Sequence, residues 1–445
     1  MPPPMSRNSL DRNSPLTRAR PGRLGKAAPS SERTHPSVAV YALLVYAAVY
    51  LIRPWESLIP ELAVVPFERL VALAIFSLVL LLAPPDFRLK TPFAGLLLWI
   101  GALILSTLTA EYIGVSWAFL VDYSKVLLFG LFLAVSLKTA ADLRTFCLGW
   151  IAIQFLYQSK ALWEFYIHGA GRYMMGIWRL AGLEDTFGHP NTFAATTLLI
   201  IPFSLAFLRT ESNPFIRAFL LTSLATSILV LFKTGSRMAL LGLFIFAIFA
   251  LFLSRHKSIF ALLLVLAIGS APFYLSDDLK DRYWTMIDLD ANESATESAA
   301  GRLEGFYKGL RILEIRPLTG VGPDCFTDVD DRFPNLTKFP GLQPHNMIGQ
   351  VLGETGLLGG LGFFCFILAI FATSWSILIR PPPQSATLQA FALASTMTLF
   401  MLLFLGLFGH NGYRYNWIWL CGLAGAAARI SQDLSPAGTK ARPTP

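Results

Sequence analysis

The sequence is poor in charge and in cysteine, and both shortages limit what the protein can be. Only 14% of its 445 residues are charged, 54% are hydrophobic, and the mean hydropathy is +0.55. Soluble globular proteins carry about 25% charged residues. Apolar runs of about 17–25 residues recur along most of the chain, and this is the length that crosses a bilayer as a helix. The composition therefore predicts a polytopic integral membrane protein.

The few cysteines exclude two common uses of this residue. They are Cys147, Cys325, Cys365 and Cys421. Only Cys325 falls in a sizeable loop, and a lone loop cysteine makes no disulfide framework. Neither the cysteines nor any other cluster of His, Cys, Asp and Glu has the spacing of a metal site, and no Gly-x-Ser-x-Gly elbow is present. The sequence predicts neither a metal nor a cofactor.

The positive charge of the chain is concentrated in an N-terminal tail, residues 1–36. The formal net charge is +8, and seven basic residues lie in this Pro/Ser/Arg-rich segment: Arg7, Arg12, Arg18, Arg20, Arg23, Lys26 and Arg33. Too few apolar residues are present for the tail to fold alone, so it is predicted to be disordered. We interpret it as a cytoplasmic positive-inside signal near anionic lipid rather than a nucleic-acid-binding arm. No small-residue cleavage site follows the first apolar stretch, which argues against a cleaved signal peptide.

Hydropathy predicts about twelve membrane spans. The apolar segments fall near 38–52, 62–83, 93–110, 117–137, 143–167, 192–208, 217–233, 237–253, 258–275, 350–379, 387–408 and 416–430. With a cytoplasmic start, the connections that carry Lys or Arg fall inside, as the positive-inside rule requires. We therefore expect an all-α membrane helix bundle with both termini in the cytoplasm. Its expected parts are spans 1–9 in 37–275, a large periplasmic loop with short helices in 276–345, spans 10–12 in 346–431 and a cytoplasmic tail in 432–445.

The large loop contains one predicted helix and one predicted tight turn. Ser294-Ala-Thr-Glu297 is a capping box that opens the helix, and Pro317 ends it. An apolar stripe at helical spacing predicts that this helix lies on the membrane surface or roofs a cavity; it consists of Leu303, Phe306, Tyr307, Leu310 and Leu313. Gly320-Val-Gly322-Pro323-Asp324 predicts a chain reversal, and because no strand precedes it, it is not a dinucleotide loop.

Several basic residues fall on the expected outer side, where topology alone does not favour them. They are Arg172, Arg179, Arg237, Arg302, Arg414, His168, His189, His345 and His410. Charged groups near a membrane are costly and are typical of functional sites. Their concentration near helix ends predicts an outward-facing site for an anionic, lipid-linked substrate.

Two of these arginines are candidates for holding a diphosphate. Thr234-Gly235-Ser236-Arg237 permits a broken backbone between two spans, where Arg237 binds phosphate oxygens through its planar fork of donors. The alternative is a plain hairpin whose arginine reaches lipid headgroups. Arg302 lies near the start of the loop helix, where the helix dipole prefers an anion, so it is either a surface residue or placed for an anionic ligand.

Further candidates lie beside two other helix starts. As a neutral imidazole, His345 can accept a proton from a sugar hydroxyl, and Asn346 can orient it or donate to a developing charge; a structural role is the alternative. In Gly188-His189-Pro190-Asn191, the helix N-terminal amides can hold phosphate or sugar oxygens, or Asn191 can simply cap the helix. Within a span, Asp122 and Lys125 form either a transporter's relay or a structural pair.

These motifs follow one another in a recognisable order. They are Arg179-Leu-Ala-Gly182, Pro190-Asn191, Thr234-Gly235-Ser236-Arg237, Gly301-Arg302, Gly320-Val-Gly322, His345-Asn346 and Leu352-Gly-Glu354-Thr-Gly356-Leu-Leu-Gly359. In this order, from about residue 175 to 365, the chain resembles the O-antigen ligase and O-antigen polymerase superfamily. The resemblance implies a GT-C-like helical bundle of the inner membrane that transfers a glycan, without a metal, from undecaprenyl diphosphate to a periplasmic acceptor.

The resemblance also implies roles for individual residues. Arg237 and Arg302 would clamp the diphosphate leaving group, and His345 would act at the reacting centre. The expected substrate-binding residues are Arg179, His189, Asn191, Ser236 and Asn346. The acceptor would be lipid A-core, a growing polysaccharide or a protein, which correspond to a ligase, a polymerase and an oligosaccharyltransferase. A transporter or flippase of the lipid-linked glycan is the alternative from a different class.

Overall fold

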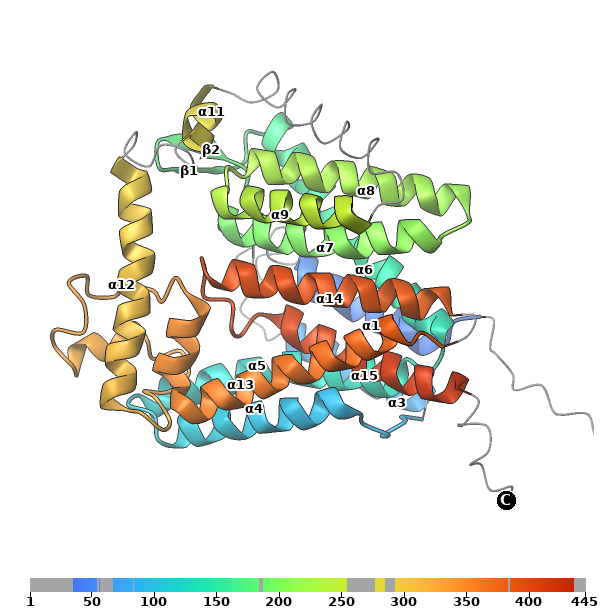
Figure 1. Cartoon of the computed structure of the whole chain (residues 1–445), viewed down its shortest axis with the longest axis horizontal. Helices are drawn as coiled ribbons and strands as arrows, with labels where there is room; N and C mark the ends of the chain where they lie inside the picture. The colour runs from blue at the N-terminus through green and yellow to red at the C-terminus, as the bar shows by residue number, and fades with distance from the viewer. Residues whose placement is uncertain are drawn as a thin grey trace, which may run out of the picture. The chain divides into compact units, whose positions relative to one another are not determined.

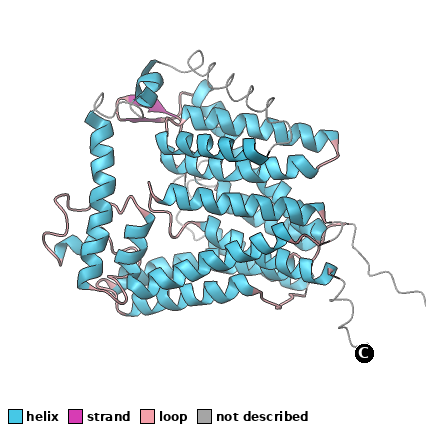
Figure 2. Cartoon of the chain, viewed as in Figure 1, coloured by secondary structure: helices cyan, strands magenta, loops and turns pink. Residues whose placement is uncertain are grey.

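The structure, a computed structural model, is helical throughout almost all of the residues it describes (Figures 1 and 2). Those residues are 35–53, 56, 67–82, 84–183, 187–253, 277–284, 293–382 and 385–435. Their α-helices are α1 (Val38–Ile52), α3 (Phe67–Leu82), α4 (Thr91–Leu108), α5 (Ile113–Ser136), α6 (Ala140–Ile167), α7 (Pro190–Thr210), α8 (Pro214–Lys233), α9 (Arg237–Leu253), α11 (Asp277–Trp284), α12 (Glu293–Ile315), α13 (Met347–Ile379), α14 (Ala386–Gly406) and α15 (Tyr415–Leu434). The expected all-α class is confirmed, with one addition: a small antiparallel hairpin of β1 (Arg172–Met174) and β2 (Ile177–Arg179).

Each apolar segment predicted within the described residues corresponds to a helix, whereas the predicted span 258–275 and the tail 1–34 lie outside them. Six of these helices are long and apolar enough to cross a membrane: α4, α5, α7, α8, α13 and α14. Two further apolar helices, α1 and α9, are shorter. The protein is therefore a polytopic membrane protein, and the number of twelve spans stays a prediction.

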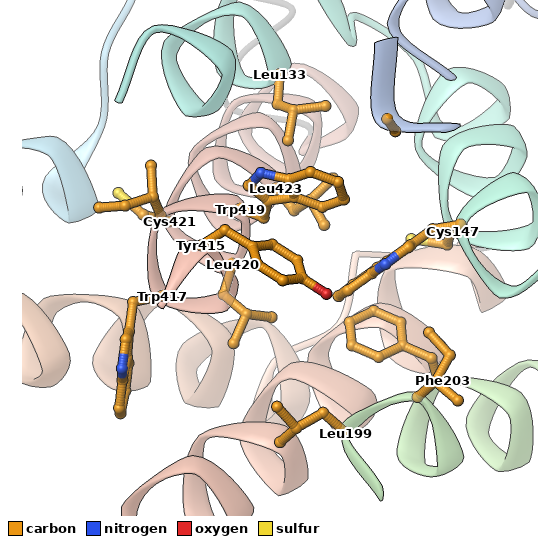
Figure 3. Close-up of a cluster of buried hydrophobic side chains, with 14 of the residues drawn as sticks. Leu133, Cys147, Leu199, Phe203, Tyr415, Trp417, Trp419, Leu420, Cys421 and Leu423 are labelled. Carbon is orange, nitrogen blue, oxygen red and sulfur yellow. The ribbon is translucent and has the colours of Figure 1, made fainter. Parts of the chain in front are cut away.

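The core of the bundle is rich in aromatic side chains that surround α15 (Figure 3). The ring centroid of Trp419 lies 4.8 Å from that of Phe129 on α5 and 5.6 Å from that of Trp150 on α6. Leu199 and Phe203 of α7 lie in the same cluster. Because such pairs add to the burial of large apolar area, the cluster fixes the position of α15 against α5, α6 and α7.

The helix α13 is broken near its start. Gly356 adopts φ 64° and ψ −163°, which is not helical. The loop before α13 takes up the backbone groups that the break frees: Gly322 N donates to Glu354 O at 2.9 Å, and Leu357 N donates to Pro317 O at 2.8 Å. Irregular backbone at membrane depth is tolerated where neighbouring protein satisfies it. The loop and α13 are thus joined by backbone hydrogen bonds.

The turn that supplies one of these bonds was predicted correctly. Gly320 and Gly322 have φ of 65° and 109°, and Asp324 has φ of 63°. Positive φ is readily adopted by glycine, so the two glycines allow the chain to reverse there. The turn brings the loop back onto α13.

The loop helix α12 exists as predicted, and its contact with α13 is formed by glycines. It ends at Ile315, before Pro317, and it packs on α13; the side chains of the predicted capping box lie outside the described residues. Leu303 and Tyr307 of the expected apolar stripe remain 55% and 45% exposed. The face turned to α13 instead contains Gly305 and Gly309, where an added Cβ would meet backbone atoms of the loop and of α13. The two glycines thus allow close backbone contact between α12 and its neighbours.

The buried face of α12 also holds a charge. Lys308 is fully buried, and its Nζ lies 2.8 Å from Asp330 Oδ2 and 4.9 Å from the centroid of the Phe326 ring. Asp330 Oδ2 also accepts a hydrogen bond from Gly341 N at 2.8 Å. A buried charge needs such a partner, and this ion pair ties α12 to the loop that follows it.

Candidate active site

One end of the bundle encloses a cavity of about 760 Å³. Its wall is formed by the starts of α7 and α15, the end of α14, Gly301 and Arg302 of α12, and the segment just before α13. α12 contributes Gly301 and Arg302 to this wall, whereas the residues of its expected apolar stripe do not line the cavity. The polar side chains of the wall include three histidines, two arginines and three asparagines: His189, His345, His410, Arg302, Arg414, Asn191, Asn411 and Asn416.

The charged side chains in this wall are all basic. No Asp or Glu is among the described residues that line the cavity. Arg302 lies over the Phe408 ring, 5.7 Å from its centroid, and Arg414 Nη2 lies 3.3 Å from Thr192 Oγ1. Neither arginine forms a salt bridge with a described carboxylate. Such a cavity favours an anionic ligand.

The start of α7 contributes His189 and Asn191 to the wall. His189 is the N-cap, because its Nδ1 accepts the Asn191 N–H at 3.1 Å. The expectation that Asn191 caps the helix is therefore wrong, since Pro190 takes the first helical position and moves the cap one residue earlier. The Asn191 side chain instead accepts a hydrogen bond from Arg179 Nη2 at 2.7 Å. With Nδ1 accepting, the proton of a neutral His189 is on Nε2.

The Thr-Gly-Ser-Arg turn between α8 and α9 is held by two buried arginines. Gly235 has φ 60°, in the left-handed region that favours glycine. Arg179 Nε donates to Thr234 O at 2.7 Å, and Arg282 Nε donates to Gly235 O at 2.7 Å. Ser236 is fully buried and is not part of the cavity wall. The turn is a rigid, arginine-clamped support beside the cavity.

Four arginines next to the cavity lie close enough for the charge of one to lower the pKa of another. They are Arg179, Arg237, Arg282 and Arg302. Burial, followed by the charge of Arg282, lowers the pKa of Arg179 to about 9. Burial, followed by the charge of Arg237, lowers the pKa of Arg282 to about 10 and also lowers the pKa of Arg302. Mutual repulsion of this kind is relieved by an anion.

Within this group, the two expected diphosphate ligands differ in position. Arg302 lines the cavity, whereas Arg237 does not, although its neighbour Met238 does. Arg179 and Arg282 donate to backbone carbonyls of the turn and act as its supports. The structure thus brings Arg302 to the cavity directly and places Arg237 beside it.

His345 reaches the cavity from a strained segment. Its φ is 47°, an uncommon value for a residue with a side chain, and such strain is concentrated at functional sites. Asn346 does not line the cavity: its Oδ1 caps α13 by accepting Ile348 N at 2.8 Å, and its Nδ2 donates to Leu407 O at 3.1 Å. Burial, followed by the charge of Arg302, lowers the pKa of His345. Its imidazole is therefore neutral at pH 7 and able to accept a proton.

Sequence reasoning left three basic residues out of the site. His410 and Arg414 lie between α14 and α15; the ring centroid of His410 is 5.9 Å from that of His345, and burial lowers its pKa to about 4. Both had been noted as outer-side cations, so their charge was the available signal. Arg282 belongs to α11 and had no motif to indicate it.

Other candidate chemistry is accounted for by packing. Lys125 Nζ lies 3.6 Å from Asp122 on α5 and 3.5 Å from Glu68 on α3, so the pair links two helices. Among the described residues, no three His, Cys, Asp or Glu side chains are placed to hold a metal ion. Cys325 is buried, with its Sγ 3.2 Å from Ser116 Oγ.

Comparison with known proteins identifies the central part of the chain. Residues 222–364 match the family described as O-antigen ligase. The matched segment contains the 234–237 turn, Arg302 and His345, whereas the α7 and α14–α15 walls of the cavity lie outside it. No curated protein matches the chain. The protein is a membrane protein that carries an O-antigen ligase domain over residues 222–364.

Proposed function

We propose that the protein transfers a glycan from undecaprenyl diphosphate to an acceptor at the periplasmic face of the bacterial inner membrane, as an O-antigen ligase does. The observation that carries the proposal is the cavity whose charged lining residues are all basic. It lies where the O-antigen ligase domain meets α7 and α15. A diphosphate that becomes a leaving group gains negative charge, which fixed guanidinium groups stabilise in a site that excludes water.

In the proposed reaction, the arginines act on the donor. The bond between the anomeric carbon of the glycan and the diphosphate oxygen breaks, and both electrons stay with the carrier diphosphate. Arg302 binds the diphosphate from the cavity wall, and Arg237 contributes from the start of α9. Arg179 holds both the 234–237 turn and Asn191, so it positions these groups rather than binding the donor.

His345 acts on the acceptor. A hydroxyl of the acceptor attacks the anomeric carbon and forms the new glycosidic bond, and its proton moves to the neutral imidazole. The lowered pKa of His345 keeps the imidazole unprotonated near pH 7, as a general base requires. Its ring faces that of His410, and both line the same cavity.

The acceptor distinguishes three enzymes that share this donor and this site. A ligase uses lipid A-core, a polymerase uses a growing polysaccharide, and an oligosaccharyltransferase uses a protein. Cells that lack the protein would lose surface attachment of a glycan that is still made if it is a ligase. They would show single-repeat chains if it is a polymerase.

The alternative from a different class is a transporter of the lipid-linked glycan. The observation that favours it is the break in α13 at Gly356, because broken helices are typical of transporter binding sites. Purified protein that moved the labelled carrier across liposomes without cleaving the diphosphate bond would support transport and exclude the transferase proposal.

The test follows release of undecaprenyl diphosphate by the purified protein, using undecaprenyl-diphosphate-linked glycan and a panel of acceptors, with and without EDTA. Release should require an acceptor and should survive EDTA. It should vanish in Arg237→Ala and remain largely lost in Arg237→Lys, because a point charge does not replace the bidentate fork. Full activity of Arg237→Ala would remove this residue from the proposal.

A further inference from the structure

The hairpin of β1 and β2 has one face that is covered by protein and one that is not. Tyr173 lies opposite Trp178 in its register, and successive side chains of a strand point to opposite faces. Ile177, the neighbour of Trp178, is buried against the turn between α8 and α9, where a Cβ on Gly235 would lie 3.3 Å from its Cδ1. Tyr173 and Trp178 therefore share the face that points away from this turn.

The uncovered face carries two aromatic rings. Tyr173 is 68% exposed and Trp178 is 47% exposed, and their ring centroids lie 6.4 Å apart. The end of α6, which precedes the hairpin, adds the exposed rings of Trp163 and Tyr166. We call residues 163–178 the aromatic segment. Large aromatic rings that the rest of the chain leaves uncovered indicate a surface that contacts a partner or a membrane.

The aromatic segment lies at the end of a helix that faces lipid. Only 33% of the most apolar stretch of α8 is buried, and α8 is long enough to cross a membrane. Leu180, directly after the hairpin, donates its N–H at 3.0 Å to the carbonyl of Lys233, the last residue of α8. Lys233 Nζ in turn lies 5.7 Å from the centroid of the Tyr166 ring. The two strands thus lie beyond the end of α8 (Figure 1), where the bilayer meets water.

The kind of side chain identifies the partner. Tyrosine and tryptophan have an apolar body and a polar tip, and they are concentrated where the hydrocarbon of a bilayer meets water. A lysine or arginine at this level lays its stem along apolar surface and keeps its charge among the headgroups, which suits Lys233 and the exposed Arg172. We propose that the aromatic segment is a membrane anchor, whose exposed rings enter the bilayer surface at headgroup level.

The anchor would fix the depth of the cavity in the membrane. Met175, at the tip of the hairpin, lines the cavity, and both Nη atoms of Arg282 lie 3.5 Å from its Sδ. Because the tip and the anchored rings belong to one hairpin, the anchor holds this part of the cavity wall near the lipid headgroups. The phosphates of a membrane lipid lie at that level. Only the consequence for the donor rests on the proposed function, whereas the anchor does not.

The test measures the depth of a fluorescent label on the purified full chain in nanodiscs of phosphatidylcholine and phosphatidylglycerol. Tyr173→Cys carries the label, and its fluorescence is quenched by a lipid nitroxide near the headgroup, by a lipid nitroxide near the end of the acyl chain, or by iodide in the water. The matched control is Asp277→Cys on α11, because the Asp277 side chain is charged and 91% exposed. Both variants also carry Cys365→Ser, since the other three cysteines are buried.

The label at position 173 should be quenched most strongly by the nitroxide near the headgroup. Iodide should quench it several-fold less than it quenches the label at position 277. If Tyr173→Cys fails to fold, Trp178→Cys takes its place, because both side chains lie on the same face of the hairpin.

Equal quenching by iodide at the two positions would overturn the anchor, because the hairpin would then lie in water. Protection from all three quenchers would also overturn it, since another protein chain would then cover the rings. Strongest quenching by the nitroxide near the end of the acyl chain would contradict the headgroup level. The measurement needs neither donor nor acceptor. The proposed function fails in a different way, when the wild type releases no undecaprenyl diphosphate with any acceptor.

Discussion

Arginines at one end of the helix bundle face carboxylates, whereas two arginines that line the cavity do not. At the end away from the cavity, Arg88 bonds to Asp86 and Asp433 at 2.6 and 2.9 Å. Arg429 is buried and donates to Leu137 O at 2.6 Å, and Arg144 pairs with Glu211. At the cavity end, Arg302 and Arg414 form no salt bridge with a carboxylate within the described part of the chain.

This difference shows that the pairing of a charge, rather than its presence, separates a structural residue from a candidate ligand-binding residue. Pairs at the far end join the connections that the sequence assigned to the cytoplasm, and they hold helix ends together. The cavity end leaves positive charge uncompensated, which costs free energy unless an anion binds. The following experiments each test one side of this contrast.

Loss of an unpaired arginine should have the largest effect. Arg302→Ala should lower the rate of carrier release by about 10²–10³, the usual effect of removing one group that stabilises developing charge. Single-turnover kinetics with saturating donor measure this rate. Arg332→Ala is the matched control from the same loop, since Arg332 pairs with Glu111 at 3.0 Å and Glu111 keeps Arg316. Equal losses in the two variants would break the contrast between paired and unpaired arginines.

The next effect should come from the proposed base. His345→Ala should lower kcat by about 10², within the range of general base catalysis, and should leave donor affinity within about threefold. Steady-state kinetics together with a donor-binding measurement separate the two quantities. An unchanged kcat would make His345 a structural residue of the strained segment before α13.

A smaller effect on kcat/KM is expected when the pH is lowered. The pKa of His345 is lowered below its ordinary value of about 6.5, so the neutral base persists to slightly acidic pH and is lost as pH falls through that pKa. We expect kcat/KM to be flat above neutral pH and to fall about tenfold per pH unit below the pKa. His345→Gln should abolish this limb. A limb centred above pH 7 would contradict the assignment, because the burial of His345 and the Arg302 charge oppose protonation.

The smallest effect on activity should come from a paired arginine. Arg429→Met leaves the carbonyls of Asp86 and Leu137 without their donor, which should destabilise the fold by about 1–3 kcal/mol. Thermal unfolding in detergent should show a lower Tm, while kcat/KM of the folded fraction stays within about twofold. A large loss of kcat/KM at an unchanged Tm would show that the far end also acts in the reaction.

The helices were largely predictable from the sequence, and their contacts were not. For example, hydropathy predicted both α7 and α13, because a membrane span needs about 20 apolar residues. The close packing of α12 on α13 was not predicted, because glycine contributes nothing to an apolar stripe, although it permits the closest contact. His410 and Arg414 were noticed as outer-side cations but not assigned to the site. Their role depends on which helix ends meet, and that is decided by tertiary packing.

The lack of a side chain at Gly305 affects the geometry of residues that lie beyond it. A Cβ on this residue would meet the carbonyl of Pro344, which precedes His345, and Arg302 lies one helical turn earlier on the same helix. The residue therefore sets the spacing between the segment that carries His345, the proposed base, and the helix that carries Arg302, the proposed diphosphate ligand. A single methyl group at Gly305 would push His345 and Arg302 apart without being part of either side chain. Only glycine, whose side chain is a single hydrogen atom, fits at this position without moving its neighbours.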